Sequence, residues 1–455
     1  MSPLVLSLAA VSWNLPLWTV APFALLLLAI ALLPLAAPHF WESNRNKLIV
    51  ALACGIPAAW YMARRASELG VPFGHDHPLV TALHDYAGFI LLLFALFTIS
   101  GGIHVRGTLA GTPSVNTGLL AIGGLIASLV GTTGASMLLI RPLLRANAVR
   151  RKKTHVVVFF IFIVSNCGGL LTPLGDPPLF LGFLHGVPFG WTLSLWREWL
   201  LVNGLLLVLF QFVDAHFFHR EDVQDKAHDL DQEVEKKRTP FGLEGGVNFV
   251  LLLGVIAVVF FSGQQHWGEE LPGLQEGALL VLALISLVVT SKQIRSANQF
   301  SFGPIVEVAV LFLGIFLSMV PALLILNARG GELGVTTPVR FFWASGTLSS
   351  FLDNAPTYMT FASVAAGAHG IAAEGRFLGD FLDPANGPVP AQIVAAIACG
   401  SVFMGANTYI GNGPNFMVKA IAEQAGVKMP SFFGYMAWSG AILIPLFVVV
   451  TLACF

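Results

Sequence analysis

The chain alternates between long apolar runs and short polar connections along most of its length. A helix needs about 20 residues to cross the hydrocarbon core of a membrane. Runs of roughly that length therefore predict membrane helices. The predicted spans are residues 18–37, 47–62, 84–105, 199–218, 247–263, 276–291, 302–326 and 432–455.

Two further apolar regions are interrupted by residues that break helices. The stretch 165–183 has prolines and glycines on both sides of Asp176, and the stretch 405–418 aligns with it so that Asn412 stands opposite Asp176. Proline removes a backbone donor, and lipid cannot satisfy the backbone groups that a break exposes. A break at membrane depth is therefore expected inside the protein or beside a polar cavity. The predicted broken helices are residues 156–188 and 389–425.

Two pairs of apolar segments look too short to cross a membrane singly. The arms of the first pair, residues 117–129 and 137–147, flank the polar stretch 131–136. The arms of the second pair, within residues 338–367, flank the stretch 351–356. Because no arm reaches about 20 residues, each pair is expected to enter and leave on one side of the membrane, as a re-entrant hairpin.

The order of hairpin and broken helix occurs twice, and an odd number of crossings separates the two occurrences, which predicts inverted repeats. A basic connection at residues 145–153 places that side of the membrane in the cytoplasm. We predict an all-α polytopic membrane protein with two inverted repeats. Its parts are N-terminal peripheral spans (1–83), repeat 1 (84–218, hairpin 117–147), a charged cytoplasmic linker (219–246), connecting spans (247–301) and repeat 2 (302–455, hairpin 338–367).

Composition agrees with a membrane protein and argues against other classes. Hydrophobic residues make up 56% and charged residues 11% of the 455 positions, whereas globular proteins carry about 25% charged residues. The net charge of -1 leaves no extended basic surface for nucleic acid. No motif brings a nucleophile, a base and an orienting group together, so an enzyme is not expected. The spans predict a multi-pass protein of the inner (plasma) membrane.

Three carboxylates lie where the membrane makes a charge costly. Asp176 lies in the first break, Asp353 at the second hairpin tip and Glu307 within an apolar span. A charge at the bilayer centre costs about 2.5 to 3.5 kcal/mol on insertion scales, so such residues usually face a cavity and have a function. The alternatives are a helix cap for Asp176 and Asp353, and a place at the cytoplasmic interface for Glu307.

Oxygen-bearing side chains concentrate at the same tips and breaks. Hydroxyl and amide oxygens suit hard cations such as sodium, although a single Ser or Thr in a membrane helix more often bonds its own backbone. The further candidate ion-binding residues are Thr132, Thr133, Ser136, Asn166, Thr172, Ser349, Asn354, Asn407, Thr408, Asn412 and Asn415. A separate loop indicates either a metal or pH-sensing site or a solvated loop. It carries His75, His77 and His84 near Asp76 and Asp85.

These motifs resemble the ion transporter superfamily, which includes NhaD-type sodium/proton antiporters, arsenite permeases, citrate transporters and sodium-coupled dicarboxylate carriers. GGLLTPLGD at residues 168–176 and SSFLDN at residues 349–354 are similar to the NhaD type. GANTYIGNGPNF at residues 405–416 is more similar to the arsenite and carboxylate branches. The resemblance covers the chain from about residue 84 to its C-terminus.

The chain also departs from the NhaD-type pattern. It has a Thr-Gly pair at residues 133–134 where that type carries Asp-Asn, and prolines after Asp176 where that type carries hydroxyls. The resemblance implies that Asp176 and Asp353 bind the transported sodium ion or proton. It also implies a homodimer in which a transport part moves against a scaffold part.

We therefore predict a secondary transporter, and specifically a sodium/proton antiporter in which the two ions compete for Asp176 and Asp353. The alternative is a cation-coupled carrier of citrate or another carboxylate, with half-helix N-termini holding the anion. No cationic side chain falls at a tip or break, which favours the antiporter. A channel or a non-transporting receptor would need fewer broken helices. The expected partners are a small cation, protons and the lipid bilayer, with no cofactor.

Overall fold

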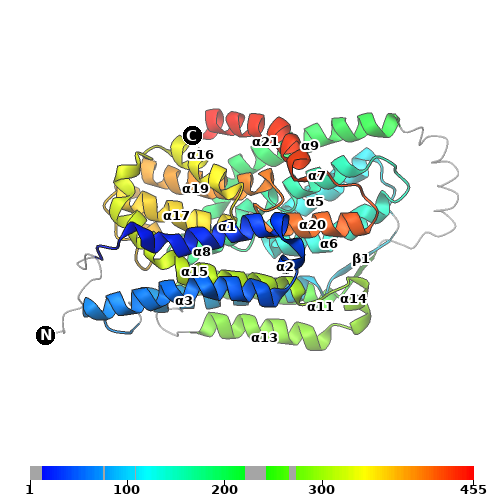
Figure 1. Cartoon of the computed structure of the whole chain (residues 1–455). Coiled ribbons are helices and arrows are strands. Elements are labelled where there is room, and N and C mark those ends of the chain that lie inside the picture. The colour runs from blue at the N-terminus through cyan, green and yellow to red at the C-terminus, as the bar shows by residue number, and fades with distance from the viewer. Residues whose placement is uncertain (1–12, 75–76, 108, 221–241, 266–272) are drawn as a thin grey trace.

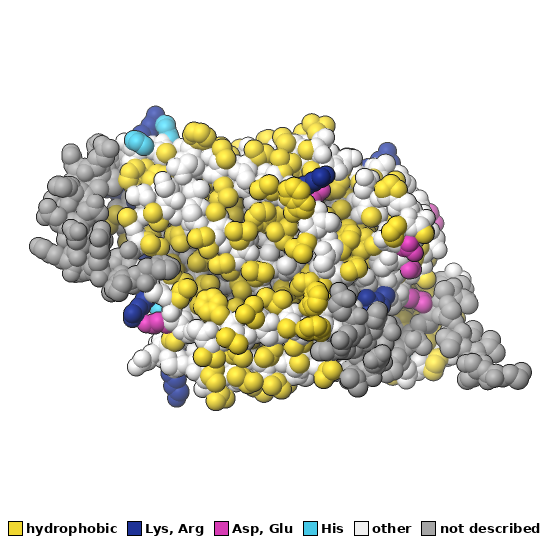
Figure 2. Space-filling view, turned by 180° about the vertical axis from the view of Figure 1, so that it is seen from behind, with side chains coloured by type: hydrophobic (Ala, Val, Ile, Leu, Met, Phe, Trp, Pro, Cys, Tyr) yellow, Lys and Arg dark blue, Asp and Glu magenta, His cyan; other side chains and the backbone are white. Residues whose placement is uncertain are grey.

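The computed structural model describes residues 13–74, 77–107, 109–220, 242–265 and 273–455, and these residues are mostly helical (Figure 1). Ten of the described helical segments are long and apolar enough to cross a membrane. Hydrophobic side chains cover most of the middle of the face drawn in Figure 2, and most charged side chains lie toward its two ends. The described residues thus form a polytopic membrane protein, as the sequence predicts.

Helices of the first half follow the predicted order. Several begin with proline, because the first turn of a helix has no use for the N–H that proline lacks. The elements are η2 (Leu17–Val20), α1 (Ala21–Ala36), α2 (Pro38–Trp41), α3 (Asn44–Glu68), α4 (Pro78–Ser100), β1 (His104–Arg106), α5 (Pro113–Val130), α6 (Thr132–Ala146), α7 (Thr154–Ile163), η3 (Cys167–Leu171), α8 (Pro177–Leu184), η4 (Trp191–Leu195) and α9 (Trp196–His219).

The second half repeats the order of hairpin and broken helix. Its elements are β2 (Gly242–Glu244), α11 (Gly246–Gln265), α13 (Leu274–Val289), α14 (Lys292–Ala297), α15 (Gly303–Arg329), η5 (Gly330–Leu333), α16 (Pro338–Ser349), α17 (Asn354–Ala368), α18 (Phe377–Phe381), η6 (Pro384–Asn386), α19 (Pro388–Met404), η7 (Gly405–Asn407), α20 (Gly413–Gln424) and α21 (Phe432–Cys454). In Figure 1, α3, α13 and α15 lie along one side of the bundle, and α9 and α21 along the other.

The predicted all-α fold needs one small correction. Strand β1 pairs antiparallel with strand β2, with Val105 opposite Leu243. The helix predicted to reach residue 105 ends at Ser100 because two glycines follow it, and Asn248 packs against the second of them, Gly102. The sheet ties the connection after α4 to the residues before α11. Most of the predicted linker, residues 221–241, lies outside the described residues.

Helix α3, the second of the N-terminal spans, packs along α15. Small residues allow the two helices to approach closely. A Cβ added to Gly314 would lie 2.7 Å from the Cβ of Ala51, and one added to Gly55 would lie 3.3 Å from the Cα of Gly314. Small residues at such a crossing are typical of helices packed within a membrane.

The first hairpin turns at a single residue. Gly131, with a φ of 83°, joins α5 to α6, and glycine adopts this region without steric cost. The prediction that residues 131–136 form the tip was therefore too wide, because Thr132 already begins α6. The second tip is narrower too. Helix α17 begins at Asn354, within the predicted tip 351–356.

The first arm is also longer than predicted. Helix α5 has 18 residues because Pro113 starts it and Thr112 accepts the N–H of Val115 at its cap, over 3.4 Å. That length places α5 among the segments able to cross a membrane, so length alone does not identify the hairpin. The far ends of the arms nevertheless meet. Asn116 Nδ2 donates to Asn147 Oδ1 over 2.9 Å, and Asn147 Nδ2 donates to Asn116 Oδ1 over 2.7 Å.

Candidate functional site

Both broken segments return to helical structure in the same way. Asp176 is the N-cap of α8 with φ -146° and ψ 144°, and Asn412 is the N-cap of α20 with φ -152° and ψ 140°. A proline follows within two residues in each case, where its fixed φ suits a helix start. The alignment of these two positions predicted from the sequence therefore has a counterpart in backbone geometry.

Asp176 is 1% exposed and lies among the side chains of Thr132, Asn354 and Asn412, which together form the Asp176 cluster. Thr132 Oγ1 donates to Asp176 Oδ1 over 2.9 Å, and Asn412 Nδ2 approaches the same oxygen at 3.3 Å. Asn354 Nδ2 donates to the other oxygen, Oδ2. Each donor comes from a different half-helix, so the carboxylate joins both hairpins to both breaks. All three donors are neutral.

Asn354 contributes one more group. Its side chain is completely buried, and its Oδ1 has no hydrogen-bond partner among the described residues. A buried polar atom without a partner is uncommon and calls for an explanation such as a bound ion. A carboxylate beside an unpaired amide oxygen offers the oxygen ligands that hard cations prefer.

The two breaks contact each other directly through asparagines. Asn166 Nδ2 donates to Asn415 Oδ1 over 2.7 Å, and Asn412 Nδ2 lies 3.2 Å from Asn166 Oδ1. Asn415 Nδ2 in turn donates to the carbonyls of Gly405 and Thr408, each over 2.9 Å. Side chains thus satisfy backbone carbonyls that the broken helix leaves free.

Each break is fixed to its own hairpin by an equivalent threonine. Thr172 Oγ1 donates to the carbonyl of Ser128, and Thr408 Oγ1 donates to the carbonyl of Ser350 over 2.5 Å. Each hydroxyl also accepts the N–H two residues later at 3.2 Å. Thr172 and Thr408 therefore make corresponding contacts in the two halves of the chain.

The remaining predicted hydroxyl and amide residues mostly brace this structure. Ser136 Oγ lies 2.8 Å from Ser165 Oγ, and Ser349 Oγ donates to the carbonyl of Ser401 over 2.6 Å. Asn407 Nδ2 donates to Ser350 Oγ over 2.9 Å. Thr133 lines a small cavity of about 60 Å³, which lies between the first hairpin tip and helices α4 and α15.

Asp353 and Glu307 differ from Asp176 in their surroundings. Asp353 is the N-cap of α17 and accepts the N–H of Ala355 at 3.2 Å, so it makes the cap contact that was the alternative interpretation. It precedes Asn354 and so lies next to the cluster. Glu307 is paired with Lys47 over 2.6 Å, and its side chain is 42% exposed. The structure does not bring Glu307 into the cluster.

Four half-helices point their N-termini at this cluster. Asp176 and Asn412 are the N-caps of α8 and α20, while Thr132 and Asn354 are the first residues of α6 and α17. Each N-terminus carries a partial positive charge of about half a unit. Among the described residues, no Lys, Arg or His side chain hydrogen-bonds to Asp176 or pairs with it. The positive potential at the site therefore comes from backbone.

A cavity of about 470 Å³ lies at the C-terminal end of α8 and is also lined by residues of α4, α13, α15 and α17. Asp85 Oδ2 and His185 Nε2 are 3.3 Å apart in its wall. His84 lines it too, whereas His77 caps α4 by accepting the N–H of Leu79 at 3.2 Å. His75 and Asp76 lie outside the described residues, and the described part of the chain contains no group of three metal-ligating side chains.

Comparison with known families gives one match. Residues 12–455 match the family described as "Putative citrate transport". The chain belongs to this family. No curated protein matches the sequence. The match extends over nearly the whole chain, which agrees with the resemblance to citrate transporters and other ion transporters deduced from the motifs.

Membership of the citrate transport family, together with ten apolar helices among the described residues, identifies a multi-pass membrane protein that acts as a secondary transporter. It also fits the expectation that the chain is not an enzyme. Of the two functions predicted from sequence, the family description names citrate transport and does not name sodium/proton exchange.

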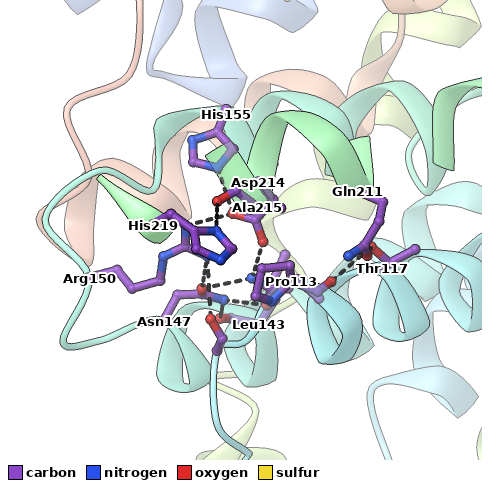
Figure 3. Close-up of polar contacts among 12 residues, drawn as sticks. Pro113, Thr117, Leu143, Asn147, Arg150, His155, Gln211, Asp214, Ala215 and His219 are labelled. Atoms are coloured by element: carbon purple, nitrogen blue, oxygen red, sulfur yellow. Dashed lines mark hydrogen bonds and ion pairs between the residues drawn. The ribbon is translucent and has the colours of Figure 1, made fainter. Parts of the chain in front are cut away.

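Sequence reasoning missed a buried charged network in this member of the citrate transport family (Figure 3). Asp214 Oδ1 forms ion pairs with Arg150 Nη2 at 2.6 Å and with His155 Nε2 at 2.7 Å, and Asn116 Nδ2 donates to Asp214 Oδ2 over 2.9 Å. The network ties the ends of the first hairpin to the start of α7 and the end of α9. A lone carboxylate in the apolar span 199–218 was the signal that could have found it.

Proposed function

We propose that this protein transports a small carboxylate anion such as citrate, coupled to a sodium ion or a proton bound at Asp176. One observation carries the cation site in this proposal. Asn354 donates to the buried Asp176 carboxylate while its own amide oxygen remains without a partner among the described residues. Carboxylate and amide oxygens are the ligand types that hard cations prefer. Thr132 would add a hydroxyl oxygen.

The anion would be held by backbone instead of by Lys or Arg. The four N-termini that meet at Asp176 supply positive potential, and a bound cation would add to it. Binding of the cation would then strengthen binding of the anion, which is the basis of coupled transport. Family membership supports citrate as the anion to test first.

Sodium/proton antiport is the second candidate. Asp176 has only neutral donors around it, so a proton or a sodium ion could neutralise the carboxylate in turn. Asp353, one residue before Asn354, would be the second carboxylate of such a site. This function needs no anion site, and the unpaired Asn354 oxygen is compatible with both candidates.

Paired contacts support the predicted inverted repeats. The equivalent bonds of Thr172 and Thr408, and the matching caps at Asp176 and Asn412, are what duplicated elements would produce. Asn116 and Asn147 bring the far ends of the first hairpin together, as a re-entrant element requires. The homodimer implied by the superfamily stays a prediction.

Proteoliposomes distinguish the candidates. We expect labelled citrate to accumulate under an imposed sodium or proton gradient, and the Asp176→Asn variant to lose that uptake while eluting as a folded protein. The result would favour antiport instead if cation pulses collapsed a proton gradient in the absence of citrate and no citrate were taken up. Both candidates would be contradicted if the protein showed no citrate uptake and no proton movement. Full activity of the Asp176→Asn variant would also contradict both.

A further inference from the structure

A groove lined by basic side chains lies where α7 and α21 begin and where α9 ends. Its volume is about 470 Å³. The lining residues are Arg151, Lys152, Lys153, Thr154, His155, Phe217, Gly426, Val427, Lys428 and Trp438. Four of these carry a fixed positive charge, and none of the described residues in the lining is Asp or Glu. Among the described lining residues, positive charges therefore outnumber negative charges.

We propose that this groove binds the phosphate-bearing headgroup of an anionic phospholipid. Each Lys or Arg near an anionic membrane surface contributes about 1 kcal/mol to such binding. Arg151 and Lys428 are exposed, and neither side chain has a hydrogen bond or ion pair with another described residue. Both are therefore available to a phosphate group.

Contacts among the lining residues join the elements around the groove. Thr154 Oγ1 donates to the carbonyl of Lys428 over 2.9 Å, which joins the connection before α7 to the connection before α21. His155, in the floor, is fixed on Asp214, and its ring stacks on Phe217 with centroids 4.6 Å apart. The elements that surround the groove are thus held together before a ligand binds.

The surrounding surface favours a lipid over a free anion. Helices α9 and α21, which border the groove, expose large apolar side chains such as Phe212 (71%) and Phe433 (78%). Trp438 lines the groove, and its indole N–H has no partner among the described residues. Tryptophan is typical of the membrane interface. The cationic groove suits the anionic headgroup of a phospholipid, and the apolar helices beside it suit the acyl chains.

This site is separate from the proposed transport site. The Asp176 cluster lies at the hairpin tips, whereas the groove lies beside the far end of the first hairpin, where Arg150 binds Asp214. Its test therefore does not depend on any transport activity. If the lipid proposal failed, the proposed transport function would be unaffected. If the transport function failed, the lipid proposal would be unaffected.

The test compares two double variants of the full chain in nanodiscs of phosphatidylcholine with increasing phosphatidylglycerol. Arg151→Gln/Lys428→Gln removes charge from the groove. Arg45→Gln/Lys292→Gln removes an equal charge at exposed residues elsewhere whose side chains likewise have no hydrogen-bond or ion-pair partner among the described residues. We expect phosphatidylglycerol to raise the unfolding temperature of the wild type and the control, and to raise that of the groove variant by less than half as much.

Equal shifts in all three proteins, or no shift in the wild type, would overturn the proposal. Soluble glycerol phosphate, added to phosphatidylcholine nanodiscs, is the second arm. If it produced the full shift, the groove would be a free-anion site and the lipid assignment would be wrong. The charge-retaining variant Arg151→Lys/Lys428→Arg should keep the shift, and its loss there would also contradict the proposal.

Discussion

Thr132 and Asp176 are joined by a hydrogen bond from Oγ1 to Oδ1 over 2.9 Å, which links the first turn of α6 to the N-cap of α8. The backbone N–H of Thr132 also donates to the carbonyl of Gly175 over 2.8 Å. A hairpin tip and a helix break that are separate in sequence are thus held as one unit. The tip cannot move from the break without loss of both bonds.

Thr132→Val should raise the cation concentration that gives half-maximal transport by about tenfold. The reason is that a hydrogen bond to a charged group contributes about 1.5 to 3 kcal/mol. The matched control is Thr133→Val, because the Thr133 hydroxyl has no hydrogen-bond partner among the described residues. Initial rates of uptake measured against cation concentration compare the two. Equal effects would show that the bond to Asp176 has no special role.

Asn354→Leu should abolish cation coupling while retaining a folded protein. Leucine has the same branched side-chain skeleton as asparagine but supplies neither the donor to Asp176 nor the unpaired oxygen. Ser349→Ala, on the other arm of the same hairpin, is the control, since its hydroxyl donates to the backbone of Ser401. Isothermal binding of sodium to purified protein reports the difference. Unchanged sodium binding in Asn354→Leu would contradict the proposed ligand.

Gly175→Ala should prevent the first break from packing. A Cβ there would lie 2.1 Å from the carbonyl oxygen of Gly169, which is backbone and cannot rotate away. Overpacking of this kind costs about 1 to 3 kcal/mol. Gly413→Ala is the control, because nothing lies within 4 Å of its Cβ. Unfolding temperature in detergent should fall for the first variant only.

Asp214→Asn should lower stability far more than Glu244→Gln does. Asp214 and Arg150 are 0% and 1% exposed, so the variant removes one partner of a buried ion pair, at a cost of about 3 to 5 kcal/mol. Glu244 pairs with Arg106 at the surface, where a pair contributes about 0 to 1 kcal/mol. Urea unfolding of both variants measures the difference. Similar midpoints would mean that the Asp214 network adds little.

Glu307→Gln should leave cation affinity unchanged. Its carboxylate binds Lys47 and has no described contact with the Asp176 cluster. A modest loss of stability is expected because the Lys47 side chain is buried and would lose its partner. Uptake kinetics and unfolding temperature separate the two effects. A large rise in the half-saturating cation concentration would return Glu307 to the ion-binding residues.

Much of the candidate site follows from the sequence, because helix-breaking residues at membrane depth have few permitted uses. The prolines that flank Asp176 locate the first break, and Pro414 locates the second. The widths of the tips do not follow, since Thr132 and Asn354 are compatible with either a loop or the first turn of a helix. Asp214 was overlooked because it lies in an unbroken apolar run, where only its partners show that it is buried.

By itself, the sequence determined that the chain crosses a membrane repeatedly, where its helices break, and that Asp176 and Asn412 occupy equivalent positions. These depend on hydrophobic length and on backbone chemistry, which are local. Only the tertiary structure decided that Thr132, Asn354 and Asn412 all reach the same carboxylate, and that Glu307 binds Lys47 instead. Contacts between residues far apart in the chain depend on how helices pack, and local sequence does not specify that packing.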